Sequence, residues 1–266
     1  MWLRTLLLLV VCALASCSQA AAFDAEAWSH LLQKHVRVYQ GGSITAVDYA
    51  GFMADKPALD RFLHATSAVS ADAFARWPKQ DQLAFLINAY NAWTVDLVLT
   101  GYPGLHSIKD LGGLFASPWK KDFIPLLGKF LSLDDIEQGL IRGSDSYHEP
   151  RVHFALNCAS RGCPPLRPEA YDGANLEQQL DDQTRKFLKD RGRNRLQGNT
   201  LQVSSIFKWY GDDFTQGWHG ITSLAVFLAR YASALGLNTT ETRLLLEGKI
   251  NITYLPYDWQ LNAAGR

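Results

Sequence analysis

The sequence has no excess of charge of either sign and is poor in cysteine. Lys and Arg together number 26, Asp and Glu also number 26, and the formal net charge is +0. A nucleic-acid-binding domain carries a strong basic excess, so no nucleic-acid partner is expected. Only 4 residues are Cys. Two of them, Cys12 and Cys17, lie close to the N-terminus, so a structural zinc site built from several cysteines is not expected.

After its first residues the chain also lacks an apolar run long enough to span a bilayer, an internal repeat and a low-complexity linker. Hydrophobic residues make up 47% and charged residues 20% of the chain, which is typical of a globular protein. We therefore expect one α+β domain over residues 23–266, mainly helical around a small β-sheet.

Residues 1–22 have the pattern of an export leader. Arg4 supplies a positive start, and the apolar run over residues 6–14 is too short for an ordinary spanning helix. Leu14-Ala15-Ser16-Cys17 resembles a bacterial lipobox, in which Cys17 would carry lipid, whereas residues 18–22 offer small side chains to an ordinary signal peptidase. We expect a periplasmic or envelope protein that is either soluble or anchored to the membrane through Cys17 alone.

The spacing of apolar residues predicts most of the regular structure. Helices are expected over residues 23–39, 80–100, 176–189 and 221–235. Ser132 should cap another helix, which carries Glu137. Residues 112–129 look irregular. Strands are expected over residues 151–157, 200–203 and 250–255.

The segment from His153 to Cys163 holds the residues best suited to chemistry. A thiol becomes a nucleophile when a base or a positive charge stabilises its thiolate, and His153, Arg151 and Arg161 could do this for Cys158. In a strand, however, His153 and Cys158 would point to opposite faces. The base would then come from a distant histidine, for which the candidates are His106, His148 and His219.

Cys158 and Cys163 are also candidates for a disulfide, because they are the two cysteines that remain after the leader. Such a bridge would close a small loop, and its entropic contribution to stability would be modest. Buried cysteines are common and inert, so a purely structural role stays open beside a catalytic or redox role.

Two further segments could complete a site. Asn88 and Asn91 share one face of the expected helix over residues 80–100. Buried amides need partners, and we favour loop backbone over a catalytic group as that partner. The run Lys208-Trp209-Tyr210 with Asp212-Asp213 mixes aromatic rings and charge, which is typical of a pocket wall or of a loop packed on the domain.

Several motifs resemble the family catalogued as domain of unknown function 547. They run in the family's order: residues 83–93, Ser132 to Glu137, His153 to Ser160 with Cys163-Pro164-Pro165, residues 203–210 with Asp213-Phe214, and residues 254–262. The resemblance implies one family domain after the leader but no settled reaction. Fusion of some members to glutaredoxin-like domains favours thiol chemistry. In the motif from Ser132 to Glu137, the family often has His directly after the Glu, whereas this chain has Gln138.

We expect a cysteine-dependent enzyme for acyl or thiol transfer or hydrolysis, acting on a small molecule or peptide without cofactor or metal. Cys158 would be the nucleophile and His153 the base or orienter, with polar support from Asn88, Asn91 or Glu137. The candidates for substrate binding are Arg151, Arg161, Lys208, Trp209 and Tyr210. The alternative is a non-catalytic binding domain with a structural Cys158–Cys163 disulfide. A metal-dependent hydrolase using His153 and acidic residues is the third possibility.

Overall fold

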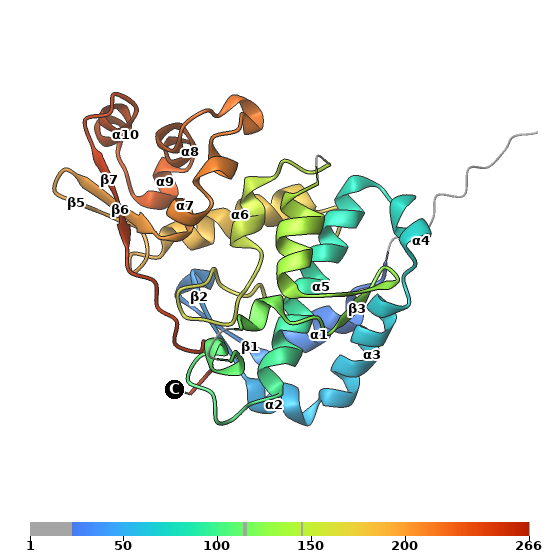
Figure 1. Ribbon diagram of the computed structural model, residues 1–266. Coiled ribbons are helices and arrows are strands. Elements are labelled where there is room, and N and C mark those ends of the chain that lie inside the picture. Colours follow the sequence, from blue (N-terminus) through green and yellow to red (C-terminus); the bar gives the residue numbers. More distant parts are fainter. Residues whose placement is uncertain (1–22, 114–115, 145, 266) are drawn as a thin grey trace, which may run out of the picture.

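The computed structural model describes residues 23–113, 116–144 and 146–265 (Figure 1). In these residues helices predominate, and their strands form three small sheets and not the single sheet expected. The expected α+β class is confirmed. The expected leader over residues 1–22, with Cys12 and Cys17, lies outside the described residues. Within those described, no helix is long and apolar enough to cross a bilayer.

The larger of two hydrophobic cores is built around helix α5 (Lys79–Leu99). This helix is buried on nearly all sides, which explains why its sequence is apolar all round and shows no single stripe. It lies within one residue of the predicted range at each end. The helices around it are α1 (Glu26–His35), α2 (Tyr49–Ala54), α3 (Lys56–Ser67) and α4 (Ala71–Ala75).

The predicted helix over residues 23–39 is wrong at its end, because α1 stops at His35 and the chain continues as strand β1 (Val36–Tyr39). β1 pairs antiparallel with β2 (Ile44–Val47). A second hairpin, β3 (Ile124–Leu126) with β4 (Lys129–Leu131), begins in the range over residues 112–129 that was expected to be irregular and extends two residues past it. The third sheet has the order β5 (Arg195–Gln197), β6 (Thr200–Ser204) and β7 (Asn251–Leu255), so the strands predicted near 200 and 250 are confirmed.

The smaller core is rich in phenylalanine and lies at the upper left of Figure 1. Phe154, Phe187, Phe207, Phe214 and Phe227 are all fully buried there, with ring centroids 4.8 to 6.5 Å apart. The helices of this region are α6 (Leu176–Lys189), α7 (Ile206–Trp209), α8 (Leu224–Arg230), α9 (Ala232–Leu235) and α10 (Thr239–Leu246). The predicted range of α6 is confirmed, whereas the helix expected over 221–235 is divided between α8 and α9.

Short helices of other types complete the fold. The π-helix η4 (Asp135–Arg142) carries Glu137. Ser132 and Asp135 exchange hydrogen bonds at its start, with Ser132 Oγ accepting from the Asp135 N–H at 3.0 Å. The 3-10 helices are η1 (Gln40–Gly42), η2 (Ile108–Leu111), η3 (Pro118–Lys120), η5 (Pro150–Phe154), η6 (Gly211–Phe214) and η7 (Trp218–Gly220).

The strand predicted over residues 151–157 is wrong, because η5 occupies most of this range. Pro150 stands in its first turn, and the Glu149 side chain accepts a hydrogen bond from the Arg151 N–H at 3.0 Å. Both features favour the start of a helix. The alternation that would have separated His153 from Cys158 therefore does not apply.

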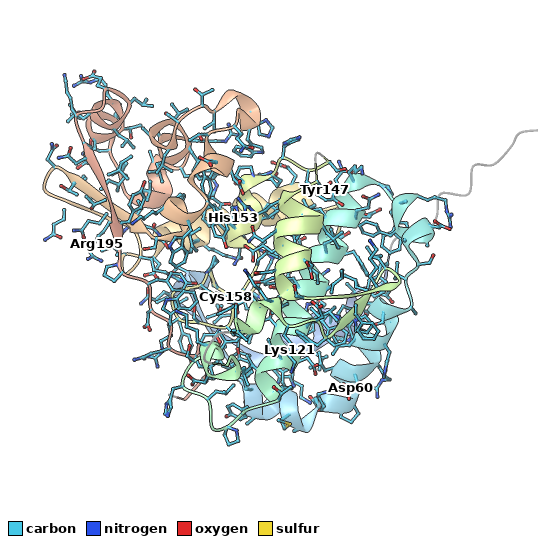
Figure 2. All side chains as sticks on the ribbon, in the orientation of Figure 1. Asp60, Lys121, Tyr147, His153, Cys158 and Arg195 are labelled. Carbon is cyan, nitrogen blue, oxygen red and sulfur yellow. A yellow bond between two sulfur atoms is a disulfide. The ribbon has the colours of Figure 1, made fainter. Side chains whose placement is uncertain are left out.

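Residues 152–156 form a seam between the two cores. Phe154 packs in the smaller core, whereas Val152, Ala155 and Leu156 belong to the larger one. Figure 2 shows His153 and Cys158 near the middle of the view, between the two regions. This seam brings residues from both cores to one cavity.

Candidate functional site

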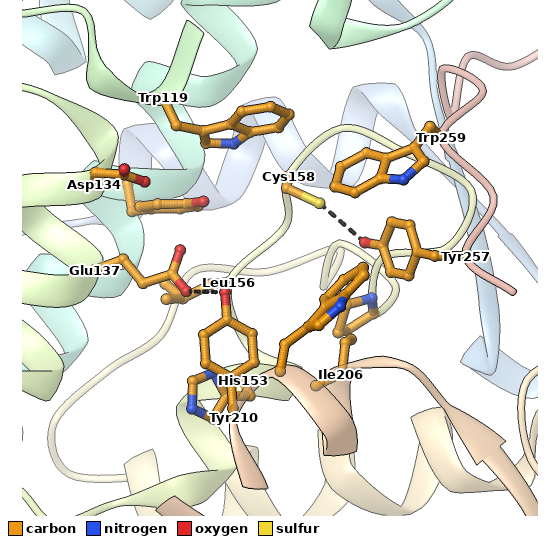
Figure 3. A pocket seen from close by; sticks show the side chains of 13 residues that line it. Trp119, Asp134, Glu137, His153, Leu156, Cys158, Ile206, Tyr210, Tyr257 and Trp259 are labelled. Carbon is orange, nitrogen blue, oxygen red and sulfur yellow. Dashed lines mark hydrogen bonds between the residues drawn. The ribbon is translucent and has the colours of Figure 1, made fainter. Parts of the chain in front are cut away.

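A cavity of about 260 Å³ opens at the seam, and Figure 3 shows its walls. The larger core and its loops supply one side, and the segments after residue 205 supply the other. The lining residues are Tyr90, Trp119, Asp134, Glu137, His153, Leu156, Cys158, Pro164, Ile206, Trp209, Tyr210, Tyr257 and Trp259. Aromatic rings and two carboxyl groups therefore dominate a space large enough for a small ligand.

A disulfide joins Cys158 to Cys163, with the sulfur atoms 2.09 Å apart. The two cysteines differ in access. Cys158 is partly exposed and lines the cavity, whereas Cys163 is only 2% exposed. A molecule in the cavity can therefore approach the sulfur of Cys158, while the sulfur of Cys163 is covered by protein.

Hydrogen-bond donors gather around these sulfur atoms. The Cys158 N–H donates to Cys163 Sγ at 2.9 Å, and Ser160 Oγ lies 3.3 Å from the same sulfur. The Tyr257 hydroxyl lies 3.2 Å from Cys163 Sγ and 3.1 Å from Cys158 Sγ (Figure 3). Burial raises the pKa of Tyr257, so its hydroxyl keeps the proton that it can donate. Such donors stabilise a thiolate more than a neutral thiol.

The Asn157 side chain holds the disulfide loop in shape. Its Oδ1 accepts from the Ala159 N–H at 3.0 Å, and its Nδ2 donates to the Pro164 carbonyl at 2.7 Å. Ala159 has a φ of 61°, a left-handed conformation that costs a non-glycine residue about 1 kcal/mol. The loop thus keeps a conformation that the local sequence alone does not favour.

Asn88 and Asn91 bind backbone rather than facing the cavity. Asn91 Nδ2 donates to the Ala155 carbonyl at 3.0 Å, and Asn91 Oδ1 accepts from the Asn157 N–H at 2.8 Å. Asn88 makes the same pair of contacts with Tyr171, at 2.7 and 2.9 Å. Asn91 therefore positions the segment that leads to Cys158.

Two carboxyl groups face the cavity from the start of η4 (Figure 3). Glu137 is 7% exposed and accepts from the Tyr210 hydroxyl at 2.7 Å. Burial, together with Glu137 itself, raises the pKa of both Tyr90 and Tyr210. Burial raises the pKa of Asp134, and Lys120 opposes this. No Lys, Arg or His of the described ranges lies within 4.0 Å of either carboxylate.

His153 pairs with Asp213, not with Cys158. His153 Nε2 lies 2.7 Å from Asp213 Oδ2, and Arg142 donates to the same carboxylate at 2.6 and 2.9 Å. Burial would raise the pKa of Asp213, but the hydrogen bonds from His153 and Arg142 outweigh it, and the pKa is lowered. The His153 ring stacks on Tyr210 with centroids 3.9 Å apart. No hydrogen bond links His153 to either sulfur among the contacts of the described residues.

The five residues expected to bind substrate divide into two groups. Trp209 and Tyr210 line the cavity, whereas Arg151, Arg161 and Lys208 do not. Arg151 is buried between Glu149 and Glu177, 2.6 Å from each. Arg161 donates to Gln260 Oε1 at 2.8 Å, and Lys208 is exposed. The distant histidines His106, His148 and His219 also lie outside the lining.

Several lining residues were not expected from the sequence as parts of the site. Trp119, Tyr257 and Trp259 form much of the aromatic wall, and Asp134 adds the second carboxylate. Tyr257 and Trp259 stand in a motif of the family resemblance, which was the available signal. Asp213 belongs to the charged run after Tyr210, but its pairing with His153 across 60 positions has no local signature. No metal-binding group of three or more His, Cys, Asp or Glu side chains occurs in the described part of the chain.

Comparison with known proteins shows a resemblance to one family and gives no function. No curated protein matches the chain, and no solved structure matches it. A family model described as "Protein of unknown function, DUF547" matches residues 74–188. This range includes the disulfide and both carboxylates, whereas the wall formed by Trp209, Tyr210, Tyr257 and Trp259 follows it. The resemblance inferred from the motifs is confirmed, and over residues 74–188 the chain resembles the DUF547 family.

Proposed function

We propose that this chain is a thiol–disulfide exchange enzyme that uses Cys158 and Cys163 as its reactive pair. The observation that carries the proposal is the asymmetry of the two sulfur atoms. Cys158 Sγ opens to a cavity, whereas Cys163 is buried and its sulfur accepts from the Cys158 N–H. The hydroxyls of Ser160 and Tyr257 lie within 3.5 Å of both sulfur atoms. Hydrogen bonds stabilise a thiolate as it leaves, and only Cys158 Sγ is open to an attacking thiolate, so Cys163 is suited to leave and Cys158 to be attacked.

The reaction needs a substrate that carries two thiols. The thiolate of one attacks Cys158 Sγ, the bond between the two protein sulfurs breaks, and Cys163 leaves as a thiolate that then takes up a proton. The second substrate thiol loses its proton and attacks the substrate sulfur of the mixed disulfide, so that Cys158 leaves as a thiolate. The substrate is oxidised by two electrons, the protein disulfide is reduced to two thiols, and the same steps run in reverse.

Trapping the intermediate tests this proposal. In Cys163→Ser the free Cys158 should form a mixed disulfide with oxidised glutathione, detected as a mass increase in the intact folded protein. The matched variant Cys158→Ser should react at least about tenfold more slowly, because Cys163 is buried. If the wild-type bridge resists millimolar dithiothreitol at neutral pH until the protein unfolds, exchange is ruled out.

A non-catalytic binding domain is the second candidate, and the aromatic cavity supports it. In that case the bridge only constrains the loop over residues 158–163. A loop this short gives a modest entropic stabilisation of about 2 kcal/mol. Binding of a small molecule by the double variant Cys158→Ser/Cys163→Ser, together with an inert wild-type bridge, would favour this candidate.

We also propose that the chain is exported to the periplasm or cell envelope, where a disulfide persists. The proposal rests on the leader pattern of residues 1–22. Cell fractionation tests export. Metabolic labelling with a fatty acid, compared between wild type and Cys17→Ser, distinguishes a lipid anchor from cleavage after the small residues 18–22.

A further inference from the structure

We infer that the cavity beside Cys158 binds an organic cation, a group of the ammonium class. The claim that this cation belongs to the enzyme's substrate rests on the proposed exchange function. The claim that the cavity binds a cation rests on the aromatic wall, the two carboxylates and the size of the cavity, and it can be tested without any redox step.

The aromatic wall is continuous. Trp259 lies 5.7 Å from Trp119, 5.8 Å from Trp209 and 4.6 Å from Tyr257, measured between ring centroids. All four residues line the cavity, and Figure 3 labels Trp119, Tyr257 and Trp259. The faces of such rings attract a cation, by about 0.5 to 2 kcal/mol for each well-placed ring. Neighbouring rings around a small space resemble the cages that bind methylated ammonium groups.

The carboxylates give the cavity the matching charge. Glu137 and Asp134 both line it and have no ion-pair partner in the described part of the chain. Glu137 accepts a hydrogen bond from the Tyr210 hydroxyl, but this hydroxyl is a neutral phenol and brings no positive charge. A buried carboxylate is costly without a positive partner, and a cationic ligand would supply that partner.

Positive side chains nearby do not cancel this charge. Lys109 lies 3.5 Å from the centre of the Trp259 ring, and Lys120 acts on Asp134, but both are exposed and neither lines the cavity. Solvent and salt screen such charges. Arg142 also acts on Glu137 through space, but its guanidinium is paired with Asp213. The contact of Lys109 also shows that Trp259 can receive a cation on its face.

The volume of about 260 Å³ lies just below the usual range for drug-sized ligands. It suits one small head group. Choline is therefore a suitable probe, and 3,3-dimethylbutan-1-ol is its matched control, because it has nearly the same shape without the charge.

Titration of the oxidised full chain, followed by tryptophan fluorescence and calorimetry, tests the inference. Choline should bind at least about tenfold more tightly than the neutral alcohol. Glu137→Gln should weaken choline binding about tenfold and leave the alcohol unaffected. Glu247→Gln, which changes a carboxylate on the exposed surface near α10, should change neither. Circular dichroism of each variant verifies that it is folded.

Equal affinity for the two probes, or choline binding weaker than about 10 mM, overturns the inference. The double variant Cys158→Ser/Cys163→Ser separates it from the proposed function. If this variant and the wild type bind choline but the wild-type bridge is inert, the exchange proposal alone fails. If the bridge exchanges but choline does not bind, the cation inference alone fails.

Discussion

The two cores are stabilised in different ways, and the cavity takes different chemistry from each. In the larger core, amides such as Asn91 bind loop backbone and fix the path of the chain. In the smaller core, five phenylalanine rings pack together with no polar group required. The larger side gives the cavity its carboxylates and disulfide, and the smaller side gives it Trp209, Tyr210 and His153. Asp213, the partner of His153, lies outside the lining. The site therefore depends on how the two cores are held against each other.

Removing one large side chain from each core tests whether they unfold together. Phe227→Ala should lower the free energy of unfolding by about 4 kcal/mol, and Leu86→Ala by about 3 kcal/mol, because each leaves a cavity where the side chain was fully buried. Urea unfolding should show one transition by both fluorescence and circular dichroism. Two transitions, of which Phe227→Ala shifts only one, would mean that the cores are independent.

Asn91→Ala tests the larger core's dependence on its amides. The variant leaves the Ala155 carbonyl and the Asn157 N–H without their partner, so the free energy of unfolding should fall by about 3 kcal/mol. Asn199→Ala is the control, because Asn199 is exposed and its loss should cost less than about 1 kcal/mol. Equal losses in the two variants would contradict a positioning role for Asn91.

The contact of Asp213 with Arg142 and His153 predicts a pH dependence. Its pKa is lowered in the folded protein, so its stabilising effect is present above the unfolded pKa of about 3.9 and is lost as the pH falls below it. Asp213→Asn should lower the free energy of unfolding by about 2 kcal/mol at pH 7, and the difference from wild type should shrink below about pH 4. Thermal unfolding measured across this range gives the answer.

Asp212→Asn is the matched control, because Asp212 is the exposed neighbour of Asp213. It should follow the wild-type pH profile. A deficit of Asp213→Asn that is the same at pH 3 and pH 7 would show that the carboxylate charge does not contribute to holding the cores together.

The smallest effect is expected from one hydroxyl that crosses the seam. Tyr210→Phe removes the donor to Glu137 and should lower the free energy of unfolding by about 1 kcal/mol. Tyr254→Phe, on the exposed face of β7, should change it by less than about 0.5 kcal/mol. If Tyr210→Phe is as stable as wild type, the hydrogen bond from Tyr210 to Glu137 does not help to join the two cores.

Local patterns in the sequence predicted the elements whose environment is uniform. Helix α5 is apolar all round because it is buried all round, and α6 is amphipathic because it lies on the surface of a core. The run over residues 151–157 was misread because a short apolar segment fits a strand or a buried helix equally well. Here Glu149 and Pro150 decide in favour of a helix.

The site could be predicted only in part. Cys158, His153, Glu137, Trp209 and Tyr210 were expected, and all five line one cavity. Its other parts depend on contacts between distant segments, such as Tyr257 with Cys158 across 99 positions. Pairing of this kind is set by the packing of the cores and leaves no periodic signal in the sequence. Whether residues 23–266 form one domain stays a prediction.

The segment Tyr257–Ala263 has a consequence for biosynthesis. Ala263 bridges Val47, and Asn262 accepts from the Tyr49 hydroxyl at 2.7 Å, so this segment closes the fold against residues near the other end of the described chain. The ribosome translates the segment Tyr257–Ala263 after Val47 and Tyr49, the residues that it contacts near that end. A nascent chain arrested before residue 257 already has Cys158, Cys163 and both carboxylates, but it lacks the hydroxyl that reaches both sulfurs. The cysteine pair is therefore translated before Tyr257 and Trp259, which complete the aromatic wall of the cavity beside Cys158.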